Sequence, residues 1–503
     1  MEVAARIQPQ PAGPVYARRR PETTLLYRTL QAHWLQFVAD IEAEGGELPA
    51  FIRDEFEAYF RCGIPANGFL RIRCKDCGDS RVVSFACKHR GFCPSCLGRR
   101  MADTAAFCVD HLFPRVPVRQ FVLSVPVSLR FRMAYSPDLT TAVLRCFIAA
   151  ITSDLRRRAR KRKIKGNLET GAMTVVQRFG TSLALNVHFH TLAVDGVWAR
   201  RPDGSLLFHP IPAPSDEDVA RIARSVCRKV HRVLARAKSN DGQTSLVEEL
   251  ANASVQGLVA TGPRRGCRVL RLGTTGPDAS AAITGKRCAE VAGFNVHANT
   301  CARANERQRL EILVKYLARP PIANHRLSEL PDGRLALQFK QAWRDGTTHV
   351  VFTPHELIEK LIPLIPRPRA HLVRYHGILG PAAEDRDKVV PRSARPEYGR
   401  TTEPAGPREM DPSSIPRLNR LPWAVLLKRV FLVDVLECPK CKGRMKILAA
   451  ITKPDSVRRV LEGLGLQSEA PRLRAARPPP QGEFGEDRAQ ADDFYADPPS
   501  TEE

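Results

Sequence analysis

Two histidines separated by one residue lie in an apolar segment with the composition of a β-strand. Residues 183–194 read LALNVHFHTLAV and contain neither Pro nor Gly. Because side chains two residues apart share one face of a strand, Asn186, His188 and His190 are expected to point the same way. Two neighbouring imidazoles can bind one divalent ion, although a histidine in a strand is more often structural. The spacing alone does not choose between a metal site and a structural pair.

A tyrosine near the end of a predicted helix is the candidate nucleophile. Residues 303–318 carry leucines at helical spacing, and Pro320-Pro321 ends the pattern. Tyr316 lies in the last turn, close to Lys315 and Arg319. Taken alone, Tyr316 fits an amphipathic packing residue. Beside a metal ion that polarises a scissile phosphate, its hydroxyl can attack a phosphodiester while the cations offset the developing charge.

Cysteine spacing predicts a zinc site. Cys74/Cys77 and Cys93/Cys96 form two CxxC pairs, and each such turn places two thiolates on one side of a tetrahedral ion. Four cysteine ligands leave no open position for water, so we expect a structural ion.

Other metal-binding side chains have no assigned partner. Cys62, Cys87 and His89 flank the two pairs, and they either replace a ligand or build a second site. Cys438 and Cys441, in the sequence CPKC, form half a zinc site without partners nearby in the sequence. The alternative for this last pair is two free thiols.

The chain is strongly basic. Its 503 residues, 43% of them hydrophobic, predict two or three folded domains. The net charge of +25 and the pI near 9.9 favour nucleic acid as a partner over a merely arginine-rich composition. No apolar run approaches the roughly 18 residues of a membrane span, and no signal peptide is visible. We therefore expect a cytosolic protein whose fourteen cysteines are thiols or metal ligands.

Clusters of basic residues mark the expected DNA-contacting surfaces. The largest follows an apolar stretch of helical spacing that includes Phe147 and Ile151. Its side chains are expected to track phosphates, and the alternative is a solvated helix end. The candidates are Arg99, Arg100, Arg156, Arg157, Arg158, Arg160, Lys161, Arg162, Lys163, Lys315 and Arg319.

Four segments, in order along residues 60–380, resemble the rolling-circle transposases of the insertion-sequence-ninety-one family. They are SFACKHRGFCPSCLGRRMAD, QRFGTSLALNVHFHTLAVDG, LEILVKYLARPPIANHRL and DGTTHVVFTPHELIEKLIPLIPRPRAHLVRYHGILGP. The resemblance implies an HUH endonuclease domain, named for a His-hydrophobic-His motif. The implied fold class is α+β, with a small cysteine-rich zinc-binding module before a central antiparallel sheet of ferredoxin-like or RRM-like type.

The resemblance also implies roles in the active site. His188-Phe189-His190 would be the HUH motif, and Tyr316 the nucleophile on a neighbouring helix. The catalytic ion would be Mg²⁺ or Mn²⁺, in addition to the structural Zn²⁺. We nominate His297 as a third ligand of the catalytic ion, with Glu311 as the alternative. Tyr375, in another family-like segment, is the rival nucleophile.

The chain departs from the two-tyrosine members of the family, which carry tyrosines four residues apart in this helix. Here Ile312 occupies the first position and Tyr316 the second, as in the single-tyrosine branch of the insertion-sequence-common-region elements. The implied reaction is rolling-circle transposition, in which single-stranded DNA at the element ends is cut and transferred to target DNA through a 5′-phosphotyrosine. A homodimer, or reuse of Tyr316, would make the second cut. The implied setting is the prokaryotic cytoplasm, at the nucleoid.

Two other functions fit the same residues. A plasmid replication initiator or conjugative relaxase uses the same HUH chemistry. A non-catalytic zinc-dependent DNA-binding protein would bind DNA without forming a covalent adduct. The zinc module and the order of the motifs favour the transposase.

Composition predicts the domain boundaries. Leucines and aromatic residues at helical spacing from Leu26 to Ile41 predict a helix at the start of the folded part. We expect a disordered N-terminus over 1–20, a helical and zinc-binding DNA-binding domain over 21–115, the transposase domain over 116–383, a linker over 384–420, a small C-terminal segment with CxxC over 421–467, and a disordered acidic tail over 468–503.

Overall fold

The computed structural model describes residues 18–236, 245–273, 285–343, 345–391, 423–431 and 434–477. Most of the predicted N-terminal disorder, the predicted linker from residue 392 and the tail from residue 478 lie outside these residues. Within them, helices accompany sheets whose strand pairings are all antiparallel, which confirms the α+β class. None of the described helices is long and apolar enough to cross a membrane.

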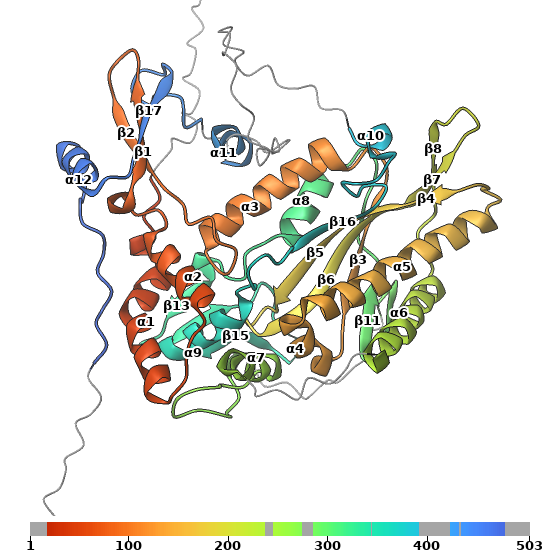
Figure 1. The fold of residues 1–503 in the computed structure, drawn as a ribbon, viewed down its shortest axis with the longest axis horizontal. Coiled ribbons are helices and arrows are strands. Elements are labelled where there is room, and N and C mark those ends of the chain that lie inside the picture. The colour runs from red at the N-terminus through yellow and green to blue at the C-terminus, as the bar shows by residue number, and fades with distance from the viewer. Residues whose placement is uncertain are drawn as a thin grey trace, which may run out of the picture.

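Seven strands form the central sheet (Figure 1). The path runs β10-β11-β3-β6-β5-β16, and β12 also pairs with β3. β6 is hydrogen-bonded on both sides, to β3 and to β5, so it lies inside the sheet. The strand bounds are β3 Val118–Ser124, β5 Gly171–Phe179, β6 Leu185–Val194, β10 Cys288–Val291, β11 Phe294–His297, β12 Cys301–Ala302 and β16 Val373–Gly377.

The strand predicted from the histidine segment is β6. Val187 and Phe189 belong to the apolar core on one face of the sheet, so His188 and His190 lie on the other. Leu183 has a positive φ of 59°, which places it in the turn before the strand. β6 therefore begins two residues later than the apolar pattern does.

Helices cover both faces of the central sheet. α4, α5 and α6 pack on the face that holds Phe189, and α3 and α8 pack on the opposite face, against Val175 and Leu192. Figure 1 shows the sheet between these two layers. The helix bounds are α3 Pro94–Phe107, α4 Val127–Tyr135, α5 Pro137–Lys161, α6 Asp216–Arg236 and α8 Arg307–Leu317.

The N-terminal module combines two helices with a small sheet. α1 (Leu25–Ala43) confirms the helix predicted from apolar spacing, and it packs on α2 (Ala50–Arg61). The rings of Trp34 and Phe56 stack between them with centroids 3.9 Å apart. The strands that follow are β1 Phe69–Cys74 and β2 Ser80–Ser84.

The third strand of this small sheet comes from the other end of the chain. β17 (Met445–Ile451) pairs with β1, beside which it lies in Figure 1. α12 (Pro454–Gly463) then packs Val457 and Leu461 against the core of the module. The predicted C-terminal segment is therefore part of the N-terminal module.

The start of the predicted acidic tail also lies on this module. The Gln31 amide of α1 donates to the Arg472 carbonyl at 2.7 Å, and the Arg474 backbone N–H donates to the Gln31 carbonyl at 3.1 Å. Residues 472–477, expected in the disordered tail, are thus held along α1 by hydrogen bonds from both backbone and side-chain groups.

Shorter elements complete the described fold. Two small sheets have the orders β13-β14-β15-β9 and β4-β7-β8. Their strands are β4 Leu168–Glu169, β7 Gly196–Arg200, β8 Leu206–Pro210, β9 Leu270–Gly273, β13 Leu327–Glu329, β14 Leu335–Gln338 and β15 Thr347–Phe352. The remaining α-helices are α7 Leu246–Gln256, α9 Pro354–Leu361, α10 Arg386–Val389 and α11 Trp423–Phe431. The single-turn and π-helical segments are η1 Pro21–Thr23, η2 Pro65–Asn67, η3 Cys108–Leu112, η4 Asn324–Arg326 and η5 Ile362–Leu364.

Candidate active site and metal centres

His188 and His190 form a pair whose ring nitrogens converge. Their Nε2 atoms are 3.0 Å apart, which fits two ligands at a right angle on an ion with bonds of about 2.1 Å. His188 Nδ1 donates to the Asn186 carbonyl at 2.8 Å, which leaves the Nε2 lone pair free for an ion. Burial lowers the pKa of His188 to about 4, and burial followed by the charge of His188 holds the pKa of His190 well below its usual value. Both rings are therefore neutral near pH 7, as metal ligands must be.

Tyr316 is brought to this pair by α8. Its ring centroid lies 6.0 Å from that of His190, with the two rings nearly perpendicular at 85°. The side chain is 43% exposed, so a substrate can approach it. The Arg319 guanidinium lies 4.4 Å from the Tyr316 ring centroid, and Lys340 Nζ lies 5.9 Å from it. Tyr316 thus has buried imidazoles on one side and two cations beside it.

The rival tyrosine is placed differently. Tyr375, on β16, pairs with Met173 of β5, and its ring is 6.1 Å from that of Phe107 in α3. One strand, β5, separates it from β6. Of these two tyrosines, Tyr316 is the one in contact with the histidine pair. Ile312, one turn before Tyr316, is 60% exposed and offers no hydroxyl.

The nominated third ligands do not join the histidine pair. His297 lies on β11, and β3 separates it from His190; two strand spacings amount to about 10 Å. The Glu311 carboxylate pairs instead with Lys315 at 2.9 Å and Arg429 at 3.1 Å. Among the described residues, no third histidine, cysteine or carboxylate groups with the pair. Both nominations are therefore corrected, because register and ion pairing hold these side chains elsewhere.

One group of four cysteines, which we call the first cysteine site, lies between α2 and α3. It consists of Cys62, Cys87, Cys93 and Cys96. The Sγ–Sγ distances are 3.3 Å for Cys87–Cys96, 3.6 Å for Cys62–Cys96 and 3.7 Å for Cys62–Cys93, close to the roughly 3.8 Å between thiolates on tetrahedral zinc. The backbone N–H of Lys88 donates to Cys96 Sγ at 3.3 Å. The geometry and donor set fit a structural zinc ion.

A second group, the second cysteine site, joins the two ends of the chain. Cys74 and Cys77 meet Cys438 and Cys441, with Sγ–Sγ distances of 3.4 Å for Cys74–Cys441 and 3.6 Å for Cys77–Cys438. Gly78 has a φ of 73°, which allows the sharp turn after Cys77. This group also has the four-sulfur geometry that zinc requires.

The expectation that the two N-terminal CxxC pairs share one ion is wrong. Each pair is completed by cysteines that the sequence had left without a partner, while His89 Nδ1 faces the Glu55 carboxylate at 3.2 Å. The separate CPKC motif was the feature of the sequence that indicated this arrangement, because two cysteines supply only half of a zinc site and need two more ligands from elsewhere in the chain. The pairings are Cys74 and Cys77 with Cys438 and Cys441, and Cys93 and Cys96 with Cys62 and Cys87.

Comparison with known families identifies both parts of the chain. The model of the transposase zinc-binding domain of IS91 matches residues 29–125. The Y2 transposase model matches residues 171–387, which hold the histidine pair and Tyr316. The chain belongs to the IS91 family of transposases. Comparison with curated proteins and with solved structures gave no match.

A basic groove of about 800 Å³ separates the zinc-binding module of this transposase from the histidine face of the sheet. α3 contributes Arg99 and Arg100, and the end of α8 contributes Arg319. Gln177 of β5, which also lines the groove, pairs with His188 on β6. The groove therefore runs from the zinc-binding module to β5, the strand beside the histidine pair. We call it the module groove.

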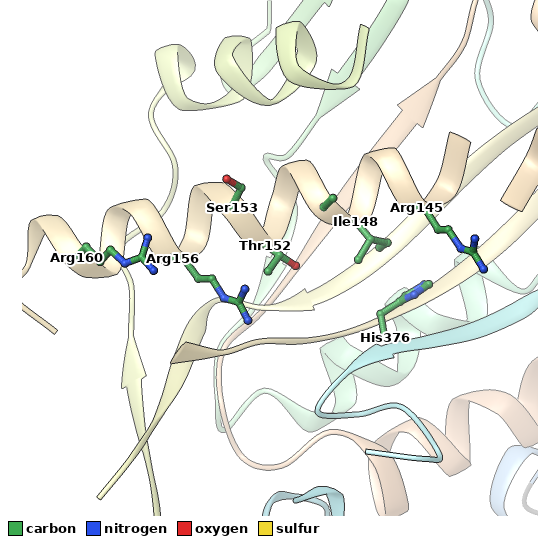
Figure 2. A pocket seen from close by; sticks show the side chains of 8 residues that line it. Arg145, Ile148, Thr152, Ser153, Arg156, Arg160 and His376 are labelled. Atoms are coloured by element: carbon green, nitrogen blue, oxygen red, sulfur yellow. The ribbon is translucent and has the colours of Figure 1, made fainter. Parts of the chain in front are cut away.

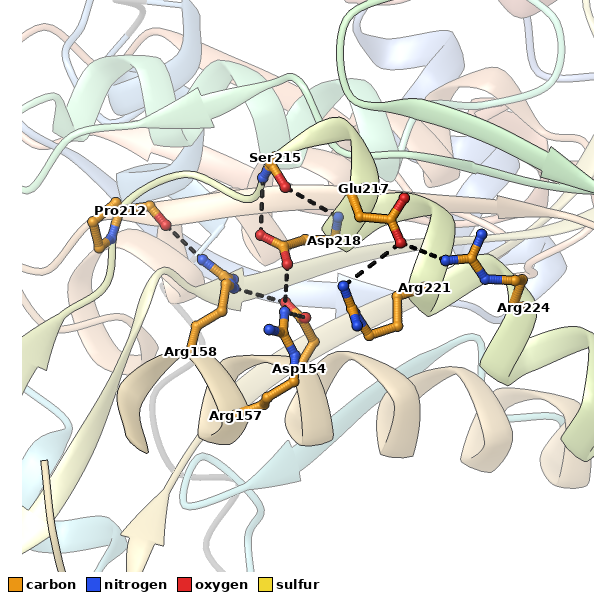
Figure 3. Close-up of polar contacts among 9 residues, drawn as sticks. All are labelled: Asp154, Arg157, Arg158, Pro212, Ser215, Glu217, Asp218, Arg221 and Arg224. Carbon is orange, nitrogen blue, oxygen red and sulfur yellow. Dashed lines mark hydrogen bonds and ion pairs between the residues drawn. The ribbon is translucent and has the colours of Figure 1, made fainter. Parts of the chain in front are cut away.

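The arginines of α5 divide between two sides of that helix. Arg156 and Arg160 line a groove beside β16 (Figure 2). Arg158 Nε instead donates to Asp154 at 2.7 Å, and Arg157 pairs both with Asp154 and with an aspartate of α6 (Figure 3). Arg157 therefore joins α5 to α6, while Arg158 pairs within α5. These carboxylates offset the charges of Arg157 and Arg158, so the two side chains are less suited to phosphate contact than Arg156 and Arg160.

The other basic candidates also differ in availability. Lys161, Arg162 and Lys163 are exposed where α5 ends. Lys315 forms an ion pair with Glu311 in the preceding turn of α8, so its charge is offset within the helix.

Proposed function

We propose that this transposase cuts single-stranded DNA at the ends of its element with Tyr316 as nucleophile, in an HUH-type site, and moves the element by rolling-circle transposition. The observation that carries the proposal is the contact of Tyr316 with a convergent histidine pair. The Tyr316 ring lies 6.0 Å from that of His190, and the Nε2 atoms of His190 and His188 are 3.0 Å apart.

The side chains around the pair suit a hard divalent ion. Mg²⁺ or Mn²⁺ bound there would polarise the scissile phosphate. Asn186 precedes His188 by two residues on the same strand, and its Oδ1 is buried without a hydrogen-bond partner among the described residues. An amide oxygen is a ligand that such ions accept. We therefore assign Asn186 to the ligand set in place of His297.

The nucleophilic step needs no other reactant. The Tyr316 hydroxyl oxygen attacks the scissile phosphorus, and the bond from phosphorus to the 3′ oxygen breaks. The phenol loses its proton and the leaving oxygen gains one, so the products are a 5′-phosphotyrosine and a 3′-hydroxyl. Attack by a 3′-hydroxyl of the target reverses the step and releases Tyr316. Arg319 and Lys340 lie where they offset the charge that develops on the phosphate.

The strand is expected to follow the module groove to the active site. Arg99 and Arg319 both line this groove, which suits a polyanion. Because α8 presents Ile312 where two-tyrosine members have a second nucleophile, each copy makes one cut at a time. The second cut then requires release of Tyr316 or a second copy of the chain.

A covalent-adduct assay tests the proposal. Purified protein is mixed with labelled single-stranded DNA from the element ends and Mn²⁺ or Mg²⁺, then separated on a denaturing gel. We expect a metal-dependent adduct that is absent from Tyr316→Phe and from His188→Ala/His190→Ala. Tyr375→Phe, the matched control, retains the adduct because its ring lies against α3.

Two results would contradict the proposal. An adduct that disappears in Tyr375→Phe and persists in Tyr316→Phe would move the nucleophile to β16. No adduct with either metal, from protein that retains its zinc and still binds DNA, would favour a chain that binds DNA without cutting it.

A further inference from the structure

A groove of about 470 Å³ runs between α5 and the edge strand β16. The α5 residues that line it recur every three or four positions, so they share one side of the helix. Figure 2 shows Arg145, Arg156 and Arg160 along this side, with His376 on the neighbouring strand. We call this feature the α5 groove.

The α5 groove has an excess of positive charge. Arg145 and Arg160 are exposed, and neither has an ion-pair partner in the part of the chain that the structure describes. Arg156 donates to the Leu168 carbonyl at 2.7 Å and approaches Glu169 only at 3.8 Å. Burial, and then the nearby charge of Arg145, lower the pKa of Arg374 on β16. The Arg374 guanidinium donates to Thr141 of α5 at 2.8 Å, so it adds positive charge near Arg145, and this excess of positive charge favours a bound anion.

Uncharged polar groups complete the lining of the groove. Ser153 is exposed beside the arginines. His376 Nε2 is 3.0 Å from Thr174 Oγ1, and burial followed by the charge of Arg374 lowers the pKa of His376 to about 4. His376 is therefore neutral near pH 7 and supplies hydrogen bonding rather than charge. Cations together with hydroxyl and imidazole groups are what phosphate oxygens bind.

The α5 groove and the histidine pair lie on opposite faces of the central sheet. His376 pairs with Ala172 of β5, which belongs to the core beneath α5. His190 pairs with Val175, which belongs to the core beneath α8. A phosphate in the α5 groove therefore cannot reach Tyr316 through the sheet.

The length of the α5 groove suits a polymer rather than a small anion. Arg145 and Arg160 are four turns apart, about 22 Å along the helix. That length covers about six base-pair steps of duplex DNA.

We propose that the α5 groove binds the phosphodiester backbone of a second DNA segment, separate from the strand that Tyr316 cuts. Only the roles of the two segments, donor and target, rest on the proposed function. In that arrangement one transposase holds the cleaved end on one face of its sheet and a second DNA segment on the other.

The test compares two charge-reversed forms of the full chain. Arg145→Glu/Arg160→Glu changes the groove, and Arg228→Glu/Arg232→Glu makes the same charge change at exposed positions of α6. Zinc content and melting temperature verify the fold of both. Binding of labelled single-stranded and duplex DNA is measured by anisotropy over a range of salt concentrations. We expect the groove variant to bind on the order of a hundredfold more weakly than the α6 variant, with the salt dependence reduced by about two phosphate contacts.

A second arm asks whether the groove is separate from the cleavage site. Wild-type protein is first joined covalently to a short single strand through Tyr316, and the binding of a second labelled DNA is then measured. We expect the adduct to bind that DNA as the free protein does, and the relative affinities of duplex and single strand identify which form the groove accepts. Equal weakening in both charge-reversed variants, or loss of the second binding event in the adduct, would overturn the proposal. If the wild type forms no adduct, the proposed function fails. The comparison of the two charge-reversed variants still tests whether the α5 groove binds DNA.

Discussion

The two cysteine sites have the same four-sulfur geometry but draw their ligands from the chain in different ways. The first takes all its ligands from residues 62–96, and three of its four cysteines are buried. The second takes half of its ligands from residues 438–441, and two of its four cysteines, Cys77 and Cys441, are exposed. One site is therefore internal to a module, whereas the other joins distant segments at its surface.

The surroundings of the sites differ in the same way. Cys62 follows the last residue of α2 and Cys93 directly precedes α3, so the first site sets how these helices meet inside the main core. The second site joins β1 to β17 through a small core of its own that includes Cys74 and Met445. We infer that the first site is required for the fold of the module, and the second for attachment of the C-terminal segment.

The largest effect is expected when a cysteine ligand of the first site is replaced. Cys96→Ser removes a buried ligand, so the zinc content falls by one ion and the module loses on the order of 5 kcal/mol of stability. Thermal unfolding and metal analysis of the purified protein measure both changes. Cys146→Ser, at a half-buried cysteine of α5, is the matched control and should leave the zinc content unchanged. Retention of all the zinc by Cys96→Ser would show that the first site is not a metal site.

A smaller effect is expected from the second site. Cys441→Ser also lowers the zinc content by one ion, but the main unfolding transition should move by only a few degrees, about the shift of a 1 kcal/mol change. The C-terminal segment should instead become sensitive to protease, because β17 loses its attachment to β1. Limited proteolysis with mass spectrometry checks this, with Cys267→Ser at another exposed cysteine as control. Unfolding as extensive as that of Cys96→Ser would remove the distinction between the sites.

The difference between contacts local in the sequence and contacts between distant segments also separates what the sequence could predict from what it could not. Local patterns succeeded: apolar residues at helical spacing identified α1, and the strand-like composition of residues 183–194 identified β6. Each depends on residues a few positions apart, where helix and strand periodicities act directly.

Partners far apart in the sequence could not be assigned in this way. Both N-terminal CxxC pairs had the correct local form, but their complements depend on how β17 pairs with β1. The same limit applies to Arg157 of α5, whose ion-pair partner Asp218 lies on α6. His297 is a third case, because strand order separates it from His190.

The two sites should also differ in how fast they lose zinc. Cys77 and Cys441 are exposed and accessible to a chelator, while Cys93 and Cys96 are buried. With excess chelator we expect zinc to be released in two phases, the fast one from the second site and the slow one from the first. The rate constants should differ about tenfold or more, because release from the first site requires local opening of the module. A colorimetric zinc indicator follows both phases, and Cys441→Ser should lack the fast one. Release in a single phase, with no change in that variant, would contradict the assignment.

The smallest effect concerns α11, which precedes the second cysteine site. Arg429 pairs with Asp110 in η3 and, at 3.1 Å, with Glu311 on the helix that carries Tyr316. A partly exposed ion pair contributes at most about 1 kcal/mol, so Arg429→Ala should leave both zinc ions and the melting temperature nearly unchanged. Protease should nevertheless cut at α11 sooner, because a contact that holds it against the module is lost. Arg458→Ala, at an exposed position of α12, is the control. If Arg429→Ala instead released zinc, the ion pair and the second site would form one cooperative unit, and the C-terminal attachment would extend to the helix of the nucleophile.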